Sequence, residues 1–513
     1  MNNGVVVKIV SGVITTCFLA VLFLFSLWHN LIAAHFKPKD PRDTRTSQST
    51  INPKNRSRKS SIASTTPLNF EFDEVNNIEF DHLITNPDAR LLTRSRCTPE
   101  GNSGNLTLHK ENENPFDDLL NAEDLRLVPQ LKFYYEQYGI SIEEFEIKTE
   151  DGFILDLWHF KPSQGVTVPS TKQPMLLMHG LLQSSASFAS GGRKSLAYYF
   201  YESGFDVWLG NNRCGFRPKW DKKIVSDDSK WNWGMREMVQ YDLRALISNV
   251  LQRTEKKKLT LVAHSQGTTQ GFMALANGES IYQDAFQILD KVENFIALAP
   301  AVYPGPLLEE KHFVRFMSRF IASSLVFGRQ SFMPQMMAMR SILVGSKLFS
   351  FLSYVMFNYL FDWNDTLWDK ALRDRHFLFS PVHISVKLMQ WWLSRDVRDQ
   401  SFKSYANEIF PEAKTWFPVR QDPGLLQNPH HTNTERDSSS ELPRILLFVP
   451  KQDRLVDGER LINHFVNFEP HSLYKIWYID EYSHLDVLWS HDVIERIGKP
   501  ALENIRRHEE LCH

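Results

Sequence analysis

One serine stands at the end of an apolar run, in a pattern that is typical of a nucleophile. The stretch Leu259-Thr-Leu-Val-Ala-His-Ser265-Gln-Gly267 runs from β-forming residues into a small-x-Ser-x-Gly turn, and the helix-forming segment TTQGFMALA follows it. A turn of this kind between strand and helix projects the serine hydroxyl at the edge of a sheet. Ala263 stands where the motif usually has its first glycine, and one extra methyl group is tolerable there. We therefore predict that Ser265 is a catalytic nucleophile.

A serine hydroxyl is a weak nucleophile near neutral pH, so it needs a base that a carboxylate orients. After a serine turn of this type the chain order of the partners is acid, then histidine. Asp453 follows the apolar run RILLFVP, and His484 follows the run KIWYID. Both residues fall in loops after late strands, at the same edge of a parallel sheet as Ser265. We predict that Asp453 and His484 complete a catalytic triad.

Other acidic and histidine residues nearby are rival candidates. Asp480 ends a predicted strand, whereas Asp453 lies in a loop, which fits the acid position better. His491 lies at least one helical turn inside the closing helix, where we expect a helix-face or surface role. The rivals that stay open are Asp457, Asp480, Asp486 and His491.

Two backbone amides are candidates for an oxyanion hole. The tetrahedral intermediate of acyl transfer carries a negative oxygen that needs preorganised donors. Met178-His179-Gly180-Leu181 closes an earlier apolar run in the manner of the loop that supplies one donor, and the residue directly after the nucleophile supplies the other. We predict that the donors are the N–H groups of Leu181 and Gln266.

The elements that must position these residues form an alternating pattern. From about residue 115 short β-rich runs alternate with helical stretches, which is the signature of βαβ units and a parallel sheet. Several runs are continuously apolar, as strands covered on both faces must be. The predicted strands are residues 144–149, 154–160, 175–178, 206–209, 259–263, 295–299, 445–449 and 475–479.

The alternation stops between residues 304 and 441, where a segment dense in Phe and Met intervenes. Seven of the thirteen methionines lie between Met317 and Met389. Such a segment packs as a helical satellite core, or its flexible thioethers and rings also form an adaptable apolar pocket, and both interpretations stay open. The segment follows the sixth strand, so it should lie over the carboxyl ends, where α/β sheets bind ligands. Residues 396–441 are predicted to be a surface loop.

The N-terminus carries twenty residues without a charge, at positions 9–28. At 1.5 Å per residue this run spans about 30 Å, the hydrocarbon thickness of a bilayer. The apolar region of a signal peptide has only roughly 7 to 15 residues, so we predict a permanent single-pass anchor. Residues 37–67 are rich in Ser, Thr, Pro and basic residues and should be a flexible tether. We therefore expect the first 67 residues to supply location and not catalysis.

The orientation in the membrane stays open. Eight basic residues between Lys37 and Lys59 favour a cytosolic position for the rest of the chain, by the positive-inside rule. Sequons at Asn55, Asn105 and Asn364 argue for the opposite side if they are glycosylated.

Composition excludes several classes of partner. The 58 basic and 60 acidic residues nearly balance, which gives no electrostatic reason to expect a nucleic-acid partner. The four cysteines lack CxxC spacing, so we expect neither a disulfide framework nor a zinc site. His430 and His431 adjoin in a polar segment with no second ligand pair near them. We expect no metal and no cofactor.

These residues sit in longer motifs that resemble the acid lipases, the family of lysosomal acid lipase and gastric lipase, from roughly residue 123 to the C-terminus. The motifs are YGISIEEFEIKTEDGFIL, HGLLQSS, WNWGMREMVQYDL, HSQGTTQ and EYSHLDVLW. Within that family, WLGNNRCGFRPKW and FVPKQDRLVDGERLINHFV look like the yeast membrane-anchored steryl ester hydrolases. The resemblance implies an α/β-hydrolase fold and hydrolysis of steryl esters to sterol and fatty acid. It also implies that Ser265, Asp453 and His484 are the triad, with Leu181 and Gln266 at the oxyanion positions.

We therefore expect an α/β-hydrolase fold with a mainly helical cap insertion, preceded by one transmembrane helix. The expected divisions are 1–36 with the anchor at about 9–28, a flexible polar linker at 37–114, the hydrolase core at 115–303 and 442–513, and the cap at 304–441. The expected partners are a steryl ester and a membrane, at the plasma membrane or at the surface of lipid droplets or the endoplasmic reticulum. A triacylglycerol lipase or an acyltransferase with the same triad are the alternatives.

Overall fold

The computed structural model describes residues 3–36, 78–80, 123–163, 173–284, 286–363, 365–394, 401–403, 409–417 and 442–506. Most of the linker predicted at 37–114 lies outside the described residues, and so do the sequon asparagines Asn55, Asn105 and Asn364 and the pair His430 and His431.

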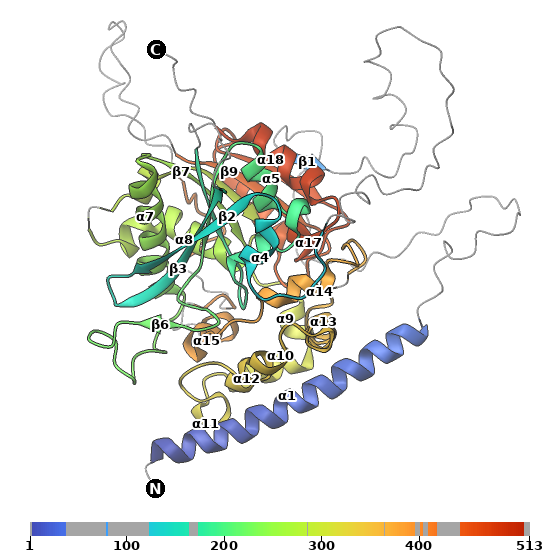
Figure 1. Ribbon diagram of the computed structural model, residues 1–513. Coiled ribbons are helices and arrows are strands. Elements are labelled where there is room, and N and C mark those ends of the chain that lie inside the picture. The colour runs from blue at the N-terminus through green and yellow to red at the C-terminus, as the bar shows by residue number, and fades with distance from the viewer. Residues whose placement is uncertain are drawn as a thin grey trace, which may run out of the picture.

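A mixed sheet of ten strands runs through the described part of the chain (Figure 1). Its order is β1-β10-β9-β8-β7-β4-β5-β3-β2, with β6 paired to β3. Neighbours from β1 to β5 along this order are parallel, whereas β3 pairs antiparallel with β5, β2 and β6. The strands are β1 (Ile78–Phe80), β2 (Ile140–Lys148), β3 (Phe153–Pro162), β4 (Pro174–Met178), β5 (Asp206–Gly210), β6 (Lys219–Trp220), β7 (Leu259–His264), β8 (Val292–Leu298), β9 (Arg444–Pro450) and β10 (Tyr474–Ile479).

All the strands predicted from the sequence are present, with ends shifted by a few residues. β1 and β6 were not predicted. β1 lies within the range predicted as linker and pairs in parallel with β10, where Ile78 is opposite Ile476. Strands of two or three residues carry too little periodicity to be recognised from sequence.

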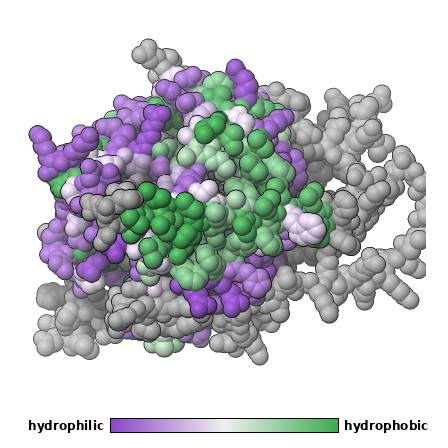
Figure 2. Space-filling model, turned by 90° about the horizontal axis from the view of Figure 1, so that it is seen from below, coloured by the Kyte–Doolittle hydropathy of each residue, from purple (hydrophilic) through white to green (hydrophobic). Residues whose placement is uncertain are grey.

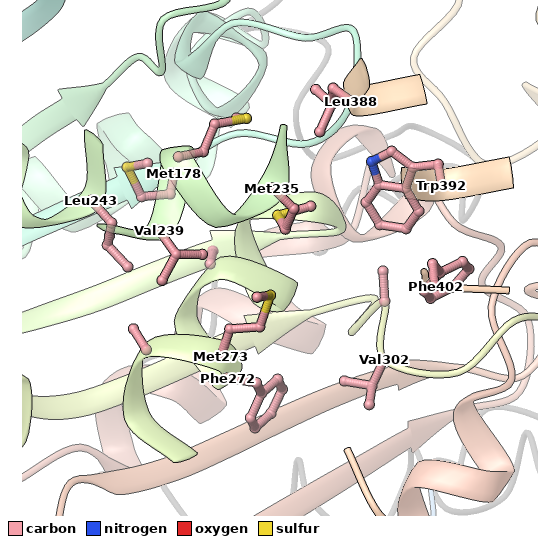
Figure 3. Close-up of a cluster of buried hydrophobic side chains, with 14 of the residues drawn as sticks. Met178, Met235, Val239, Leu243, Phe272, Met273, Val302, Leu388, Trp392 and Phe402 are labelled. Atoms are coloured by element: carbon pink, nitrogen blue, oxygen red, sulfur yellow. The ribbon is translucent and has the colours of Figure 1, made fainter. Parts of the chain in front are cut away.

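The central strands are buried on both faces, which explains their continuous apolar runs. Alternate residues enter two separate cores, because successive side chains of a strand point to opposite faces. In β8, Phe295 joins one core and Ile296 joins the other. Figure 3 shows part of the first core, in which Phe272 packs in one cluster with Trp392 and Phe402 of the insertion.

Helices cover both faces of the sheet. Side chains of α7, α8 and α16 enter the first core, and those of α5, α17 and α18 enter the second. The helices outside the insertion are α4 (Leu131–Glu136), α5 (Leu196–Glu202), α6 (Met235–Glu237), α7 (Arg244–Thr254), α8 (Gln266–Ile281), α16 (Gly458–Phe468), α17 (Asp486–Trp489) and α18 (Lys499–Asn504). Short 3₁₀ turns are η3 (Ser185–Phe188), η4 (Gly192–Lys194) and η6 (Ile288–Asp290), and π-helical turns are η5 (Met238–Leu243) and η10 (Ile494–Gly498).

The insertion between β8 and β9, called the cap below, is helical, as predicted. Its elements are α9 (Leu307–Glu310), α10 (His312–Phe320), α11 (Ser324–Phe327), α12 (Pro334–Leu343), α13 (Lys347–Phe361), α14 (Arg373–His376), η7 (Phe377–Phe379) and α15 (Val386–Leu393). The prediction of a surface loop at 396–441 holds only in part for its described residues: they form neither helix nor strand and residues 412–415 are exposed, but the aromatic side chains there are buried. These are Phe402, Phe410, Trp416 and Phe417. Burial of large apolar side chains is favourable even where their neighbours in the sequence are polar.

The N-terminal helix α1 (Asn3–Phe36) contains the segment Val6–Ile32, which is long and apolar enough to cross a membrane. This helix does not stand apart from the rest of the protein. It lies along the cap, in contact with α11, α12 and α13 (Figure 1). Its side chains Phe18, Leu19 and Leu22 are buried in the first core.

Candidate active site

Ser265 lies between the last residue of β7 and the first residue of α8, at the carboxyl edge of the sheet. Its backbone has φ 50° and ψ −116°, a region that non-glycine residues rarely adopt. Gly267 makes the close approach of helix and strand possible, since a Cβ there would lie 2.7 Å from the carbonyl oxygen of Met178. Ala263 is fully buried within β7, so its extra methyl is accommodated. This strained turn between β7 and α8 is the kind of turn that the small-x-Ser-x-Gly motif predicted.

The loops after β9 and β10 bring Asp453 and His484 to Ser265. His484 Nε2 lies 2.8 Å from Ser265 Oγ, and His484 Nδ1 lies 2.6 Å from Asp453 Oδ2. All three residues are buried. With its proton on Nδ1, the imidazole donates to the carboxylate and accepts from the hydroxyl. This hydrogen-bond chain lets His484 take the hydroxyl proton while Asp453 holds the ring in place.

Backbone amides hold Asp453 in position. Its Oδ1 accepts from the N–H groups of Leu455 at 2.9 Å and Val456 at 3.3 Å, which leaves Oδ2 to His484. Because the carboxylate is satisfied on both oxygens, its side chain is fixed before substrate binds.

The rival acids and histidine have other partners. Asp457 caps α16 by accepting from Arg460 N–H at 3.0 Å. Asp480 pairs with Lys451 at 2.9 Å, and Asp486 accepts from Ser483 and Trp368. The last rival, His491, contacts the cap: its Nδ1 lies 2.8 Å from the carbonyl oxygen of Leu367. The sequence favoured Asp453 and His484 but left these rivals open, because each stands within a few residues of the same strand ends.

The loop after β4 carries Leu181 and lies beside Ser265. A Cβ on Gly180 would lie 2.8 Å from Gln183 Oε1 and 2.9 Å from His264 Nδ1, so a larger residue here would displace these side chains. Leu181 lines the same cavity as Ser265. Gln266 occupies the first turn of α8, where backbone N–H groups have no partner within the helix. The oxyanion assignment of both amides stays a prediction.

Sequence analysis missed a buried polar pair behind the nucleophile. His264 Nδ1 lies 3.0 Å from Gln183 Oε1, and His264 Nε2 lies 3.1 Å from the carbonyl oxygen of His484. Both partners are acceptors, and a neutral imidazole has a single N–H to donate. The neutral ring can donate to only one of these two oxygens, and it lies between the loop after β4 and the loop that carries His484. In the sequence, the position of His264 directly before Ser265 was the signal that could have pointed to it.

Two tryptophans of the cap also reach the site. Trp363 stacks on the imidazole of His484, with ring centroids 5.4 Å apart and an interplanar angle of 7°. Trp392 donates its indole N–H to Gln266 Oε1 at 3.0 Å. The cap thus contacts both the histidine and the residue after the nucleophile. No local motif pointed to either tryptophan, since the chain folds them onto the site from a distance.

Burial changes the protonation of the residues around the triad. It lowers the pKa of His179 to about 4 and holds the pKa of His264 well below its ordinary value, so both rings are neutral near neutral pH. Burial also raises the pKa of Asp486 to about 6, against the opposing effect of hydrogen bonds from Ser483 and Trp368. The rings of His179 and His264 therefore add no positive charge near Ser265 at neutral pH.

A large apolar cavity opens at Ser265. Its empty volume is about 1230 Å³, mouth included, and both Ser265 and His484 lie in its wall. Only five of its thirty lining residues are polar: Gln183, His264, Ser265, Ser380 and His484. Five of the methionines noted in the sequence line it, namely Met317, Met333, Met336, Met356 and Met389. The cap is thus both a packed core and the wall of a pocket.

The described residues contain no group of three or more His, Cys, Asp or Glu side chains that could hold a metal ion. Two cysteines are described, the exposed Cys17 and the buried Cys214, and both are free thiols.

The fold and the position of Ser265 define the class: this protein is an α/β hydrolase. Residues 173–333 match the family described as alpha/beta hydrolase fold, and residues 131–192 match a partial alpha/beta-hydrolase lipase region. The chain is 58% identical to sterol esterase 2 of Saccharomyces cerevisiae, over 97% of each chain. It therefore belongs to the α/β-hydrolase lipase family that includes this sterol esterase.

More distant relatives are lipases. The human gastric triacylglycerol lipase is 26% identical over 70% of this chain and 86% of its own, and a probable lipase of Schizosaccharomyces pombe is 29% identical over 73% and 79%. Among solved structures, a carboxylesterase from Bacillus subtilis aligns with a TM-score of 0.38 and 12% identity, over 72% of this chain and 93% of its own.

Proposed function

We propose that this protein is a sterol esterase, which releases a sterol and a fatty acid from a steryl ester. The observation that carries the proposal is the 58% identity to a yeast sterol esterase over almost the whole chain. The geometry supports the same chemistry, because Ser265, His484 and Asp453 are hydrogen-bonded in series at an apolar cavity.

The proposed reaction has two halves. Ser265 Oγ attacks the ester carbonyl carbon while His484 Nε2 takes the hydroxyl proton, and the backbone N–H groups of Leu181 and Gln266 stabilise the oxyanion. The bond from carbon to the sterol oxygen breaks, and His484 returns the proton to that oxygen. Water then attacks the acyl-enzyme, His484 accepts its proton and passes it to Ser265, and the fatty acid leaves.

The cavity fits a substrate that is apolar on both sides of the ester bond. A steryl ester offers only the ester oxygens for polar recognition, and among the few polar groups of the lining, Gln183, His264 and His484 lie close to Ser265. The remaining wall is made of Leu, Met, Phe and Trp side chains, which gain stability by contact with hydrocarbon.

A triacylglycerol lipase with the same triad is the second candidate, because gastric triacylglycerol lipases are among the relatives. The two functions differ only in which ester is preferred. Purified protein should be given cholesteryl or ergosteryl oleate and triolein in the same mixed micelles. We expect the larger kcat/KM for the steryl ester, and a larger value for triolein would favour the lipase.

Ser265→Ala is the control for the chemistry. It should remove steryl ester hydrolysis and labelling by a fluorophosphonate probe, while the wild type shows both. A wild type that hydrolyses no ester would refute the proposed function. Adding free sterol to the assay separates hydrolysis from acyl transfer, since a transferase would form a new steryl ester.

We further propose that the enzyme acts at a lipid surface, at the plasma membrane or at the surface of lipid droplets or the endoplasmic reticulum. The apolar segment Val6–Ile32 supports a membrane attachment. We also propose that the chain divides into a core at 115–303 and 442–513 and a cap at 304–441, as the sequence predicted. Imaging of a C-terminally tagged protein, combined with protease protection, tests the location and the orientation.

A further inference from the structure

The N-terminal helix α1 has two apolar faces with different surroundings. Phe18, Leu19 and Leu22 are buried, and their spacing places them on one face of the helix. Leu24 and Trp28, in contrast, are 67% and 64% exposed. A helix that served only as an anchor would have no reason to bury one face against the cap.

Aromatic contacts fix the buried face to the cap. The ring of Phe18 lies 5.6 Å from that of Phe313, 5.3 Å from that of Phe316 and 6.1 Å from that of Phe327. The ring of His29 lies 5.4 Å from that of Tyr359. Such ring pairs stabilise a packed contact beyond the burial of their area.

Hydrogen bonds add to this contact at both ends of α1. Gln335 of α12 donates to the carbonyl oxygen of Gly12 at 3.2 Å, and Asn30 donates to the carbonyl oxygen of Val355 in α13 at 3.3 Å. These two hydrogen bonds hold α1 to α12 near its N-terminal end and to α13 near its C-terminal end.

The buried face also borders the cavity at Ser265. Phe18, Leu19 and Leu22 line the same continuous space as Ser265 and His484. Figure 1 shows α1 on the side of the cap that is away from the sheet. The three side chains therefore meet the part of a bound ester that is remote from the carbonyl carbon.

We propose that Phe18, Leu19 and Leu22 bind the apolar end of the ester, so that the N-terminal helix is part of the substrate site. The proposal rests on the ester hydrolase function proposed above. It assigns α1 a role in specificity, because the wall it forms limits how long or bulky a substrate can be. Without α1 the cavity would be open along this side.

A pair of leucines on opposite faces of α1 provides the test. Leu22 is 2% exposed and lines the cavity, whereas Leu24, two residues away, is 67% exposed. Leu22→Trp and Leu24→Trp change the apolar character of the helix equally, so they should affect membrane attachment equally. Full-length proteins are purified in detergent, and kcat/KM is measured for p-nitrophenyl esters from acetate to palmitate.

Leu22→Trp should lower the ratio of kcat/KM for palmitate to that for acetate by roughly tenfold or more, since a filled pocket rejects the longer chain. Leu24→Trp should leave the ratio at the wild-type value. Leu22→Ala should shift the preference in the opposite direction, toward longer chains, because only a residue in the pocket wall gives shifts of both signs.

Equal ratios for Leu22→Trp and Leu24→Trp would overturn the proposal, and so would equal ratios for Leu22→Ala and the wild type. If Leu22→Trp does not fold, as judged by circular dichroism, Leu19→Ala and Leu22→Ala decide by the same ratio. Failure of the proposed function is seen in a different measurement, because the wild type would then hydrolyse none of the esters. In that case the proposed role of α1 in substrate binding would also be refuted.

Discussion

Two short hydrogen bonds make Ser265, His484 and Asp453 dependent on one another. We predict that Ser265→Ala, His484→Ala and Asp453→Asn each remove nearly all turnover, with Asp453→Asn lowering kcat by about 10⁴ because the amide favours the wrong tautomer. Combined variants should lose little more than single ones, since the three residues act as a unit. Steady-state assays of purified variants measure this, and near-wild-type activity of Asp453→Asn would move the acid to Asp457 or Asp480.

The oxyanion amides need a backbone substitution, because no side-chain deletion removes them. Leu181→Pro eliminates one N–H and should raise the barrier by about 2.7 to 4 kcal/mol, seen as a lower kcat. A thermal melt controls for folding, since Gly180 and Gln183 pack tightly in the same loop. An unchanged kcat would place the donor elsewhere between residues 180 and 183.

Asp486 should make the free energy of unfolding fall as the pH rises, which is the opposite of what a salt-bridged carboxylate does. Burial raises its pKa to about 6, so between the ordinary value of 3.8 and this value the folded chain binds more protons than the unfolded chain. Its contribution to stability is therefore present at low pH and is lost as the pH rises through about 6. At 1.36 kcal/mol per pKa unit, the loss is at most about 3 kcal/mol.

The comparison with Asp486→Asn isolates this group from other titrations, because asparagine does not ionise. Unfolding in urea at pH 4 and at pH 7 gives the free energy of unfolding for both proteins. The advantage of the wild type over the variant should be larger at pH 4. A difference that stays constant or grows with pH would show that Asp486 is ionised throughout.

At the scale of elements, α1 departs from what we expected. The sequence predicted that the first 67 residues supply location alone, but three side chains of α1 line the cavity at Ser265. Deleting residues 1–36 should therefore change the ratio of kcat/KM for long-chain esters to that for short-chain esters, even in detergent. It should also lower the melting temperature, since each fully buried apolar side chain contributes about 1.5 to 3 kcal/mol.

If the protein that lacks residues 1–36 kept the wild-type preference for ester chain length and the wild-type melting temperature, α1 would be only an anchor. The matched control is a chain that keeps residues 1–36 and lacks residues 40–67, which the structure does not describe. If the tether is only a linker, this control should retain the wild-type profile.

At the scale of the whole molecule, one side of the protein is hydrophobic. Figure 2 views the molecule from the side of α1 and the cap and shows a broad green area there. The exposed apolar residues on α1 and the cap include Leu24, Phe25, Trp28, Leu31, Leu325, Ile342, Leu348 and Phe351. An apolar patch on this scale marks a surface for a membrane or another protein, and α1 lying along the cap would place the cavity next to lipid.

Trp28→Glu and Ile342→Glu should therefore weaken binding of the full-length protein to phosphatidylcholine vesicles in a flotation assay. Each puts a charge on the lipid-facing side, at a cost of roughly 2 to 3 kcal/mol or more if the position is within the hydrocarbon. Ile224→Glu is the control, since Ile224 is similarly exposed but belongs to neither α1 nor the cap. Equal flotation of all three variants would contradict the assignment of this side to lipid.

Local sequence patterns were sufficient to predict eight of the ten described strands, the serine turn and the order of the three polar residues. These features depend on local patterns: β-rich apolar runs, a helix after Ser265, and loops at predictable strand ends. A parallel sheet then brings the ends of its strands to one edge, so Ser265, Asp453 and His484 could be expected to lie near one another before any coordinates were known.

Only the tertiary structure decided which distant residues share the cavity. Phe18 and Ser265 line one space although almost 250 residues separate them, and Trp363 lies on His484 from the cap. Apolar burial is non-directional, so an apolar helix carries no local signal that says whether lipid or protein will cover it. The hydropathy of α1 therefore predicted an anchor, and the contacts with α10, α11 and α13 revealed that one face of it belongs to the cavity.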